Sequence, residues 1–176
     1  MPQSFLVAIF STVFLLLVAG AFLFIYFRSQ LHEVDEIWSE LLNKLRLRLD
    51  KIPNLIETLR AFTTGQDNYF AELIKLRAST WPLEHADKKR VHAELDVSDK
   101  LRFAWELQQK FPELGKDTNF LSLHTDFRSV SKEIDSTSHR YNERARRFNR
   151  QSGFPLIKPF LLILGFRKLQ IFEFEE

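Results

Sequence analysis

The sequence predicts an all-α protein in which an N-terminal transmembrane helix precedes an antiparallel helical bundle of about four helices. Two patterns predict this fold: a single long apolar run near the N-terminus, and apolar residues that recur at three- and four-residue steps through most of the remaining chain. The composition agrees, because 45% hydrophobic and 27% charged residues exclude a disordered chain. Only five Gly and six Pro among 176 residues disfavour a many-turned β architecture.

The N-terminal apolar run extends from Phe5 to Phe27. As a helix it reaches roughly 34 Å, which is enough to cross a hydrocarbon core about 30 Å thick. Tyr26 and Arg28 stand where interfacial residues are expected. A cleaved signal peptide is the alternative, but the first four residues carry no Lys or Arg and the apolar run continues beyond the small residues at 19–21. We therefore expect an uncleaved single-pass anchor.

The orientation of the anchor follows from the basic residues on its two sides. The short N-terminal flank has no Lys or Arg, whereas Arg28, Lys44, Arg46, Arg48 and Lys51 follow the run. The positive-inside tendency then places the domain after the anchor in the cytoplasm.

The first helix of the bundle is expected to begin near Leu31 and to be interrupted near residues 49–53. Its apolar residues form a heptad-like seam that continues to residue 62: Leu31, Val34, Trp38, Leu41, Leu45, Ile52, Leu55, Leu59 and Phe62. Pro53 removes a backbone hydrogen bond within this pattern, so we expect a kink or a break there. Thr63, Thr64 and Gly65 end the helix.

Three further helices follow, at about 66–80, 91–110 and 118–152. Trp81-Pro82 ends the first of them, and the charged stretch His85–Arg90 is expected to be a surface connection. The last has the clearest apolar periodicity, with Asp117 or Thr118 as its N-cap.

The final 23 residues open with an apolar stretch, 154–166, that is too short to span a membrane. It is expected to cap the open end of the bundle, and the alternative is a position in the membrane interface. The predicted domains are therefore the anchor at 1–28, the bundle at 29–153, and the cap and tail at 154–176.

No reaction motif accompanies this architecture, so no catalytic, cofactor-binding or metal-binding residue is predicted. The chain has no Cys, its five His lack metal-ligand spacing, and the phosphate-binding and nucleophile-elbow motifs are absent. Carboxylates such as Asp35, Glu36, Glu133 and Asp135 are expected on solvated helix faces. A net charge of +2 argues against a nucleic-acid binder.

A basic cluster at His139–Arg150 is the one concentrated charge feature. Its arginines could contact anionic lipid or an acidic partner. A solvated helix face with local partners such as Glu143 is the simpler reading. The arginines are Arg140, Arg144, Arg146, Arg147 and Arg150.

Several polar residues lie on or near the apolar seam beside Pro53. Arg48 occupies a position where an apolar residue is expected, and Asp50 and Asn54 are close in sequence. Buried polar groups need partners, since an unsatisfied one costs roughly 1–3 kcal/mol. We expect Arg48, Asp50, Pro53 and Asn54 to form a structural network that satisfies backbone groups freed by the proline.

Several short motifs resemble one known family when they are taken in order. Residues 48–58 are similar to R-x-D-L-I-P-N-L-V-E-T, 76–78 to A-R-A, and 111–123 to Y-P-x-L-K-x-x-x-x-F-x-x-L of the LemA family. The Tyr-Asn and Phe-Asn pairs within 140–149 resemble its Y-N…Y-N spacing, and 165–172 resembles its G-F…Y-F ending. The chain departs from the family pattern at Leu47 and Lys51, and at 65–66, where the family has His-Glu.

The resemblance implies a membrane-anchored helical bundle with N-out, C-in topology, of bacterial type, in a family without a settled catalytic activity. With the absence of a reaction motif, the leading hypothesis is a non-enzymatic scaffold that binds an unidentified protein partner at the cell membrane, without cofactor or nucleic acid. The alternatives are a membrane-remodelling or lipid-binding protein and, third, a metal-dependent enzyme. Homo-oligomerisation stays open.

Overall fold

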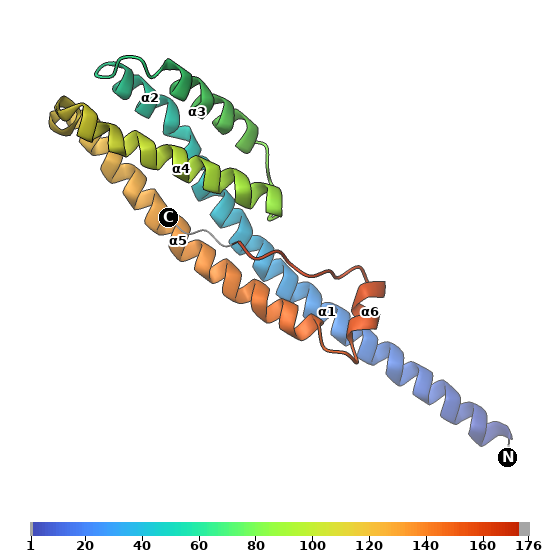
Figure 1. The fold of residues 1–176 in the computed structure, drawn as a ribbon. Helices are drawn as coiled ribbons and strands as arrows, with labels where there is room; N and C mark the ends of the chain where they lie inside the picture. Colours follow the sequence, from blue (N-terminus) through green and yellow to red (C-terminus); the bar gives the residue numbers. More distant parts are fainter. Residues whose placement is uncertain (1, 173–176) are drawn as a thin grey trace. The chain divides into compact units, whose positions relative to one another are not determined.

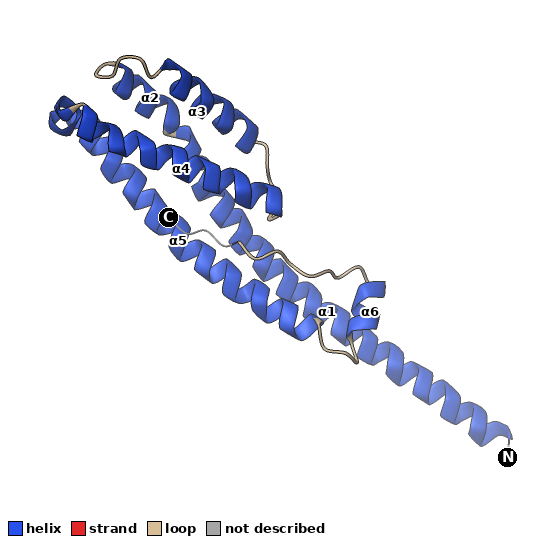
Figure 2. Cartoon of the chain, viewed as in Figure 1, coloured by secondary structure: helices blue, strands red, loops and turns tan. Residues whose placement is uncertain are grey.

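The computed structural model describes residues 2–172 and is helical, with no strand among those residues (Figures 1 and 2). Six α-helices and one 3-10 helix follow one another: α1 Pro2–Asp50, α2 Ile52–Arg60, α3 Asp67–Thr80, α4 Lys88–Lys110, η1 Pro112–Lys116, α5 Thr118–Ser152 and α6 Lys158–Ile163. The all-α prediction of an apolar N-terminal helix followed by several packed helices is confirmed.

The predicted interruption of the first helix lies at Lys51, between α1 and α2. Pro53 occupies the first turn of α2, where its missing N–H and fixed φ are tolerated. Asp117 Oδ1 accepts the N–H of Phe120 at 2.7 Å, as expected of an N-cap of α5.

One boundary was predicted wrongly. Residues 85–90 were expected to be a surface connection, but α4 begins at Lys88, and Arg90 is fully buried. Asp87 accepts the N–H of Arg90 at 2.8 Å and so starts the helix earlier than the apolar pattern indicated.

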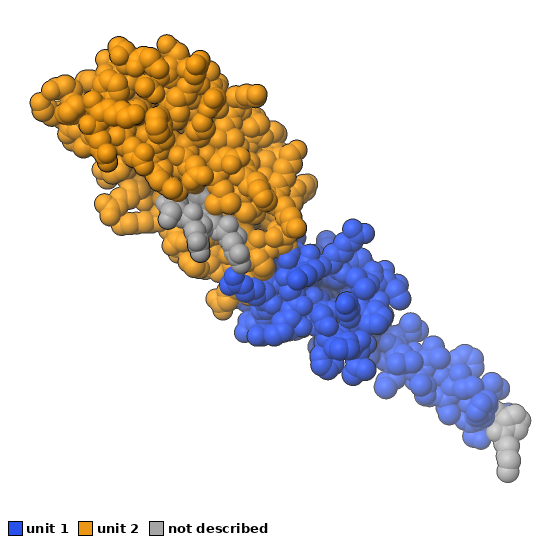
Figure 3. Space-filling model, viewed as in Figure 1, with its two compact units in different colours: residues 1–36, 144–169 blue, residues 37–143, 170–176 orange. Residues whose placement is uncertain are grey.

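The described residues form two compact units (Figure 3). Unit 1 consists of residues 1–36 and 144–169, and unit 2 of residues 37–143 and 170–176. Each unit therefore joins segments that are distant in sequence. The division into consecutive domains at 1–28, 29–153 and 154–176 stays a prediction.

Unit 1 contains the candidate membrane span. By length and composition, α1 is the single helix in the described part of the chain that could cross a membrane, and no residue in the most apolar window of that helix is buried. A helix that is apolar on all sides and unburied is typical of a lipid-facing segment. The core of the unit is small and consists of Phe27, Phe148, Leu161 and Phe166.

Unit 2 holds the main hydrophobic core. Its buried apolar side chains come from the end of α1, from α2, α3, α4 and η1, and from the first half of α5: Leu49, Ile52, Leu55, Ile56, Leu59, Phe70, Leu73, Val97, Leu101, Ala104, Leu107, Leu114, Phe120 and Phe127. Trp105 packs against Phe120 and Phe127 at ring-centroid distances of 5.6 and 5.3 Å. This stripe-on-stripe packing is what the three- and four-residue apolar spacing predicts.

Two asparagines of α5 bind the backbone of the C-terminal tail. In unit 2, Asn142 Nδ2 donates to Phe172 O at 2.6 Å, and Asn142 Oδ1 accepts the N–H of Phe172 at 2.8 Å. In unit 1, Asn149 makes the same pair of bonds with Leu169, at 2.9 and 2.7 Å. A primary amide offers one donor and one acceptor side by side, so each asparagine pairs with a peptide group much as a neighbouring strand would.

We expect Asn142→Ala to destabilise unit 2 by about 1–3 kcal/mol, because both hydrogen bonds to Phe172 are buried. The free energy of unfolding from urea titration of the full chain measures this change, and the amide of Phe172 should exchange hydrogen faster. Asn43 is exposed on α1, so Asn43→Ala is the matched control and should change stability by less than about 0.5 kcal/mol. Equal effects of the two substitutions would contradict the assignment.

Candidate functional site

Arg48 lies on α1 with a fully buried side chain, as its place on the apolar seam predicted. Its Nη2 atom is 2.6 Å from Glu94 Oε2 on α4, and its Nη1 donates to Ser98 Oγ at 3.1 Å. Glu94 is fully buried as well. An ion pair in this setting is held by short, charge-assisted hydrogen bonds rather than by water.

A second buried arginine shares the same carboxylate. Arg90 Nη2 forms an ion pair with Glu94 Oε1, one turn further along α4, and Arg90 Nη1 donates to the backbone oxygen of Thr80 at 3.0 Å and of Leu83 at 2.5 Å. We call Arg48, Arg90 and Glu94 the buried ion cluster. It contains two guanidinium groups and one carboxylate, so the backbone carbonyls between α3 and α4 offset part of the excess positive charge.

Burial lowers the pKa of Arg90, and the nearby Glu94 carboxylate opposes that shift, while Arg46 and Arg48 add to it. A guanidinium nevertheless stays protonated in proteins, so the cluster keeps its charges. All three side chains are enclosed. They therefore fix how α1, α4 and the α3–α4 connection pack, and they do not form an open reaction site.

The other three residues of the predicted network lie differently. Pro53 and Asn54 are exposed, and Asp50 is exposed and pairs with Arg77 Nη2 at 3.2 Å. Pro53 cannot donate to the carbonyl four residues earlier, that of Leu49. Arg77 Nε donates to this oxygen at 2.9 Å. The side chain that binds the carbonyl left by the proline therefore comes from α3 and not from the residues of the predicted network.

Sequence reasoning missed Arg77, Arg90 and Glu94. Arg90 was assigned to the surface connection at 85–90, and Glu94 was not singled out within the helix expected from Val91. The signal was present, because positions 90 and 94 continue the stripe of Val97, Leu101 and Ala104 at the same three- and four-residue steps. The rule that singled out Arg48 would have found them.

The arginines of the basic cluster differ in their ion-pair partners and in their exposure. In unit 2, Arg140 Nη1 is 3.2 Å from Glu40 Oε2, and in unit 1, Arg144 Nη1 is 3.0 Å from Glu33 Oε2. These pairs join α5 to α1, so the partners of the two arginines come from a distant part of the sequence and not from neighbours such as Glu143. Arg146, Arg147 and Arg150 belong to unit 1, and their side chains are exposed.

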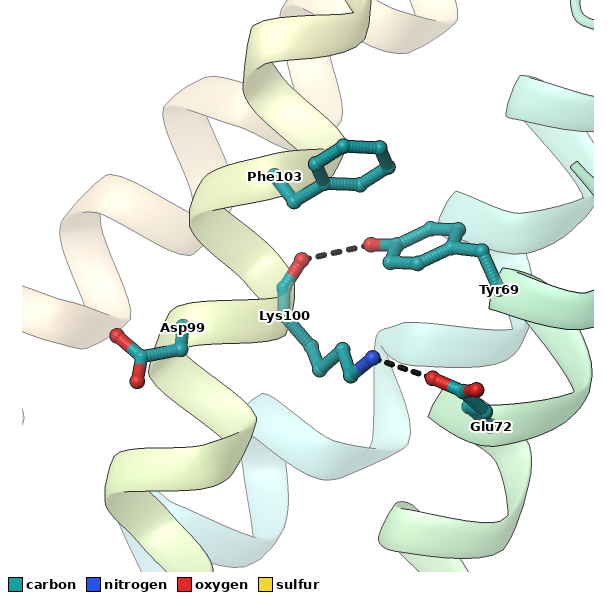
Figure 4. Close-up of a pocket in the computed structure, with 5 residues that line it drawn as sticks. All are labelled: Tyr69, Glu72, Asp99, Lys100 and Phe103. Carbon is teal, nitrogen blue, oxygen red and sulfur yellow. Dashed lines mark hydrogen bonds and ion pairs between the residues drawn. The ribbon is translucent and has the colours of Figure 1, made fainter.

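A hollow of about 380 Å³ lies between α3 and α4 in unit 2 (Figure 4). Its lining consists of Tyr69, Glu72, Asp99, Lys100 and Phe103. The Tyr69 and Phe103 rings are half-buried with centroids 4.8 Å apart, and the Tyr69 hydroxyl donates to the backbone oxygen of Lys100 at 2.6 Å. Lys100 also lies over the Tyr69 ring and forms an ion pair with Glu72, which Figure 4 shows as a dashed line.

The titrating groups of the hollow already have partners within the chain, since Glu72 pairs with Lys100 and Asp99 pairs with Arg102. Burial raises the pKa of Tyr69, so its hydroxyl stays protonated and donates throughout the physiological range. The hydrogen bond from Lys100, together with its charge, lowers the pKa of Glu72. A phenol that donates to a backbone oxygen and a carboxylate that is paired with an ammonium do not form a nucleophile–base pair.

Across residues 2–172, no group of three or more His, Cys, Asp or Glu side chains lies close enough to hold a metal ion. The model of the LemA family matches residues 37–176. The chain belongs to the LemA family. No curated protein matches it. The LemA family is not a known enzyme family.

The residues that carry the LemA resemblance have packing roles in this structure. Arg48 belongs to the buried ion cluster, and Arg77 binds the carbonyl that Pro53 leaves without a helix donor. Asn142 and Asn149, the asparagines of the Tyr-Asn and Phe-Asn pairs, bind the tail backbone. The LemA motifs of this chain therefore describe how a bundle is held together.

We expect Glu94→Ala to destabilise the bundle by about 3–5 kcal/mol, because it leaves two buried guanidinium groups without their shared carboxylate. Urea denaturation of the full chain measures the change. Glu84→Ala is the matched control, since Glu84 pairs with Arg46 at 2.9 Å but is exposed, and it should cost less than about 1 kcal/mol. Similar losses in the two variants would contradict the cluster's role.

The Glu72 carboxyl should titrate below the ordinary range for glutamate, because Lys100 stabilises its charged form. Its pKa is lower in the folded than in the unfolded chain, so the pair contributes stability above the unfolded pKa and loses it as the pH falls through the folded pKa. Carbon-13 NMR of the side chain measures the midpoint. Lys100→Met should move it up towards the ordinary value, and an unchanged midpoint would contradict the pairing.

Proposed function

We propose that this LemA-family chain is a membrane-anchored, non-enzymatic scaffold that binds a protein partner at the cytoplasmic face of the cell membrane. The observation that carries the proposal is the hollow between α3 and α4, where two half-buried aromatic rings lie beside a preformed ion pair. Aromatic side chains that are partly buried before binding are typical centres of protein interfaces, because little further ordering is needed.

The anchor supports the membrane part of the proposal. No residue in the apolar window of the N-terminal helix is buried, as a lipid-facing helix requires. The segment 144–169, in the same compact unit as the span, has seven Lys and Arg and no Asp or Glu, whereas the residues before the span have none of the four. This asymmetry favours an outside N-terminus and a cytoplasmic bundle.

The chemistry of the hollow defines the partner. Tyr69 and Phe103 offer apolar ring faces, and Glu72 and Lys100 set charges of both signs beside them. Asp99 points away from these side chains in Figure 4 and pairs with Arg102 at 3.0 Å. A protein segment that presents an apolar side chain next to a charged one would fill this hollow and compete for the Glu72–Lys100 pair. Because the aromatic rings contact each other without the partner, binding would require little rearrangement.

A second candidate function, binding to membrane lipid, is favoured by one observation. Residues 154–163 in unit 1 expose large apolar side chains near the span. This surface and the α3–α4 hollow belong to different units, so each can be tested separately.

The scaffold proposal predicts a specific photo-cross-link in native membranes. Benzoyl-phenylalanine in place of Phe103 of the full-length chain should give one recurrent, stoichiometric adduct identified by mass spectrometry. The same probe in place of Leu121, which is 43% exposed on α5 of the same unit, is the matched control and should not give that adduct.

A charge exchange makes the test sharper. Glu72→Lys combined with Lys100→Glu preserves an ion pair within the chain but reverses its direction, so the fold should be kept while the adduct at position 103 is lost. Circular dichroism checks the fold. An adduct that persists in the exchanged variant, or that forms equally at position 121, would overturn the proposal. An adduct of the chain with itself would identify the partner as a second copy of the chain.

A further inference from the structure

The segment between α5 and the tail exposes four large apolar side chains. Phe154 is 55% exposed, Leu156 83%, Leu162 56% and Ile163 85%. Leu161, between them in sequence, is buried against the small core of unit 1. Leu161 thus holds the segment against the core of unit 1, whereas the four large apolar side chains remain on the surface of that unit. Transfer of apolar side chains of this size out of water is favourable, so a group of them on one surface indicates a contact with something apolar.

The depth of this segment follows from its contacts with α1. A Cβ added to Gly20 would lie 3.1 Å from the Phe160 ring, so the glycine allows that ring to approach closely. Phe166 packs against Phe24 and Phe27, with ring centroids 5.9 and 6.1 Å apart. The segment therefore lies beside residues 20–27, the last part of the apolar run that precedes Arg28.

A bilayer that covers the apolar run must also reach this segment. From Gly20 to Phe27 a helix rises about 10.5 Å. Interfacial elements lie about 5–10 Å into the boundary between headgroups and acyl chains. The contact of Phe166 with Phe24 and that of Phe160 with Gly20 place the segment from about 4.5 to about 10.5 Å along the helix from Phe27, which matches the depth of an interfacial element on the C-terminal side of the span.

The charges around the segment complement an anionic surface. Arg147, Arg150, Lys158, Arg167 and Lys168 are all exposed, and the segment 144–169 contains no acidic residue. The whole chain has a net charge of only +2, so the excess of basic residues is confined to this part. Basic side chains next to a membrane contribute about 1 kcal/mol each with anionic lipids.

We propose that residues 154–168 form an interfacial membrane element, which inserts Phe154, Leu156, Leu162 and Ile163 into the leaflet on the C-terminal side of the span and places the surrounding arginines and lysines on anionic phospholipid headgroups. Pro155 and Pro159 keep the helix short, and Lys158 can extend its ammonium towards the headgroups from its apolar surroundings. The proposal deepens the lipid-binding candidate and rests on the membrane anchoring of the proposed function.

The absence of Cys from the chain allows a direct measurement of depth. Leu156→Cys and Ile163→Cys, each carrying a nitroxide, are reconstituted as full-length protein in vesicles of phosphatidylcholine and phosphatidylglycerol. Electron paramagnetic resonance then measures collisions with oxygen, which partitions into lipid, and with a water-soluble nickel chelate. Leu16→Cys in the span is the lipid control, and Leu121→Cys on α5 of unit 2 is the water control.

The labels at 156 and 163 should resemble the label at 16, with nickel collisions lost and oxygen collisions retained. If they resemble the label at 121 while the label at 16 stays protected, the interfacial element is wrong and the anchor stands. If the label at 16 is also accessible to nickel, the anchoring itself fails.

The headgroup contacts need a second measurement. Spin-labelled phosphatidylglycerol should be immobilised by the full chain to a greater extent than spin-labelled phosphatidylcholine. Arg147→Gln with Arg150→Gln should reduce that difference, whereas Arg128→Gln with Lys132→Gln, exposed residues of α5 in unit 2, should leave it unchanged. Equal immobilisation of the two lipids by the unmodified chain would overturn the charge assignment.

Discussion

The packing of unit 2 depends on one carboxylate that is shared by two buried arginines. Glu94 sits between Arg48 of α1 and Arg90 of its own helix, and Arg90 also binds the backbone that leads from α3 into α4. Such a cluster adds little net stability compared with an apolar core of the same volume. The cluster instead favours one helix register, because a shift of α4 by one turn would leave charges buried without partners. The cluster therefore fixes the register in which the apolar stripes meet.

That register also determines the geometry of the exposed surface between α3 and α4. Tyr69 and Glu72 come from α3, and Lys100 and Phe103 from α4, so their contacts exist only if the two helices keep one alignment. Arg90 binds the backbone of Thr80 and Leu83, at and just after the C-terminal end of α3. A surface preorganised in this way suits recognition, since a partner does not have to order the side chains it contacts.

Much of this architecture could be predicted from local rules, and the failures have one physical cause. The apolar periodicity predicted the helices, and Pro53 predicted the interruption found at Lys51. Arg48 stood out because it was a charge on an apolar seam. Its partner Glu94 did not, because which helix faces α1 is a tertiary fact, and a glutamate one turn from an arginine is most often a solvated pair. The asparagines that bind the tail were visible only as a motif, since an amide side chain gives no sign of which peptide group it will bind.

The arrangement of unit 1 bears on how the chain is held at a membrane. A single span leaves a protein free to tilt, because the hydrophobic match of one helix to the bilayer depends only weakly on tilt angle. A second contact in the interface removes part of this freedom. Gly20 allows the Phe160 ring to approach closely, because a Cβ at that position would lie 3.1 Å from the ring. The close approach of Phe160 to Gly20 thus couples the depth of α6 to the depth of the C-terminal part of the span.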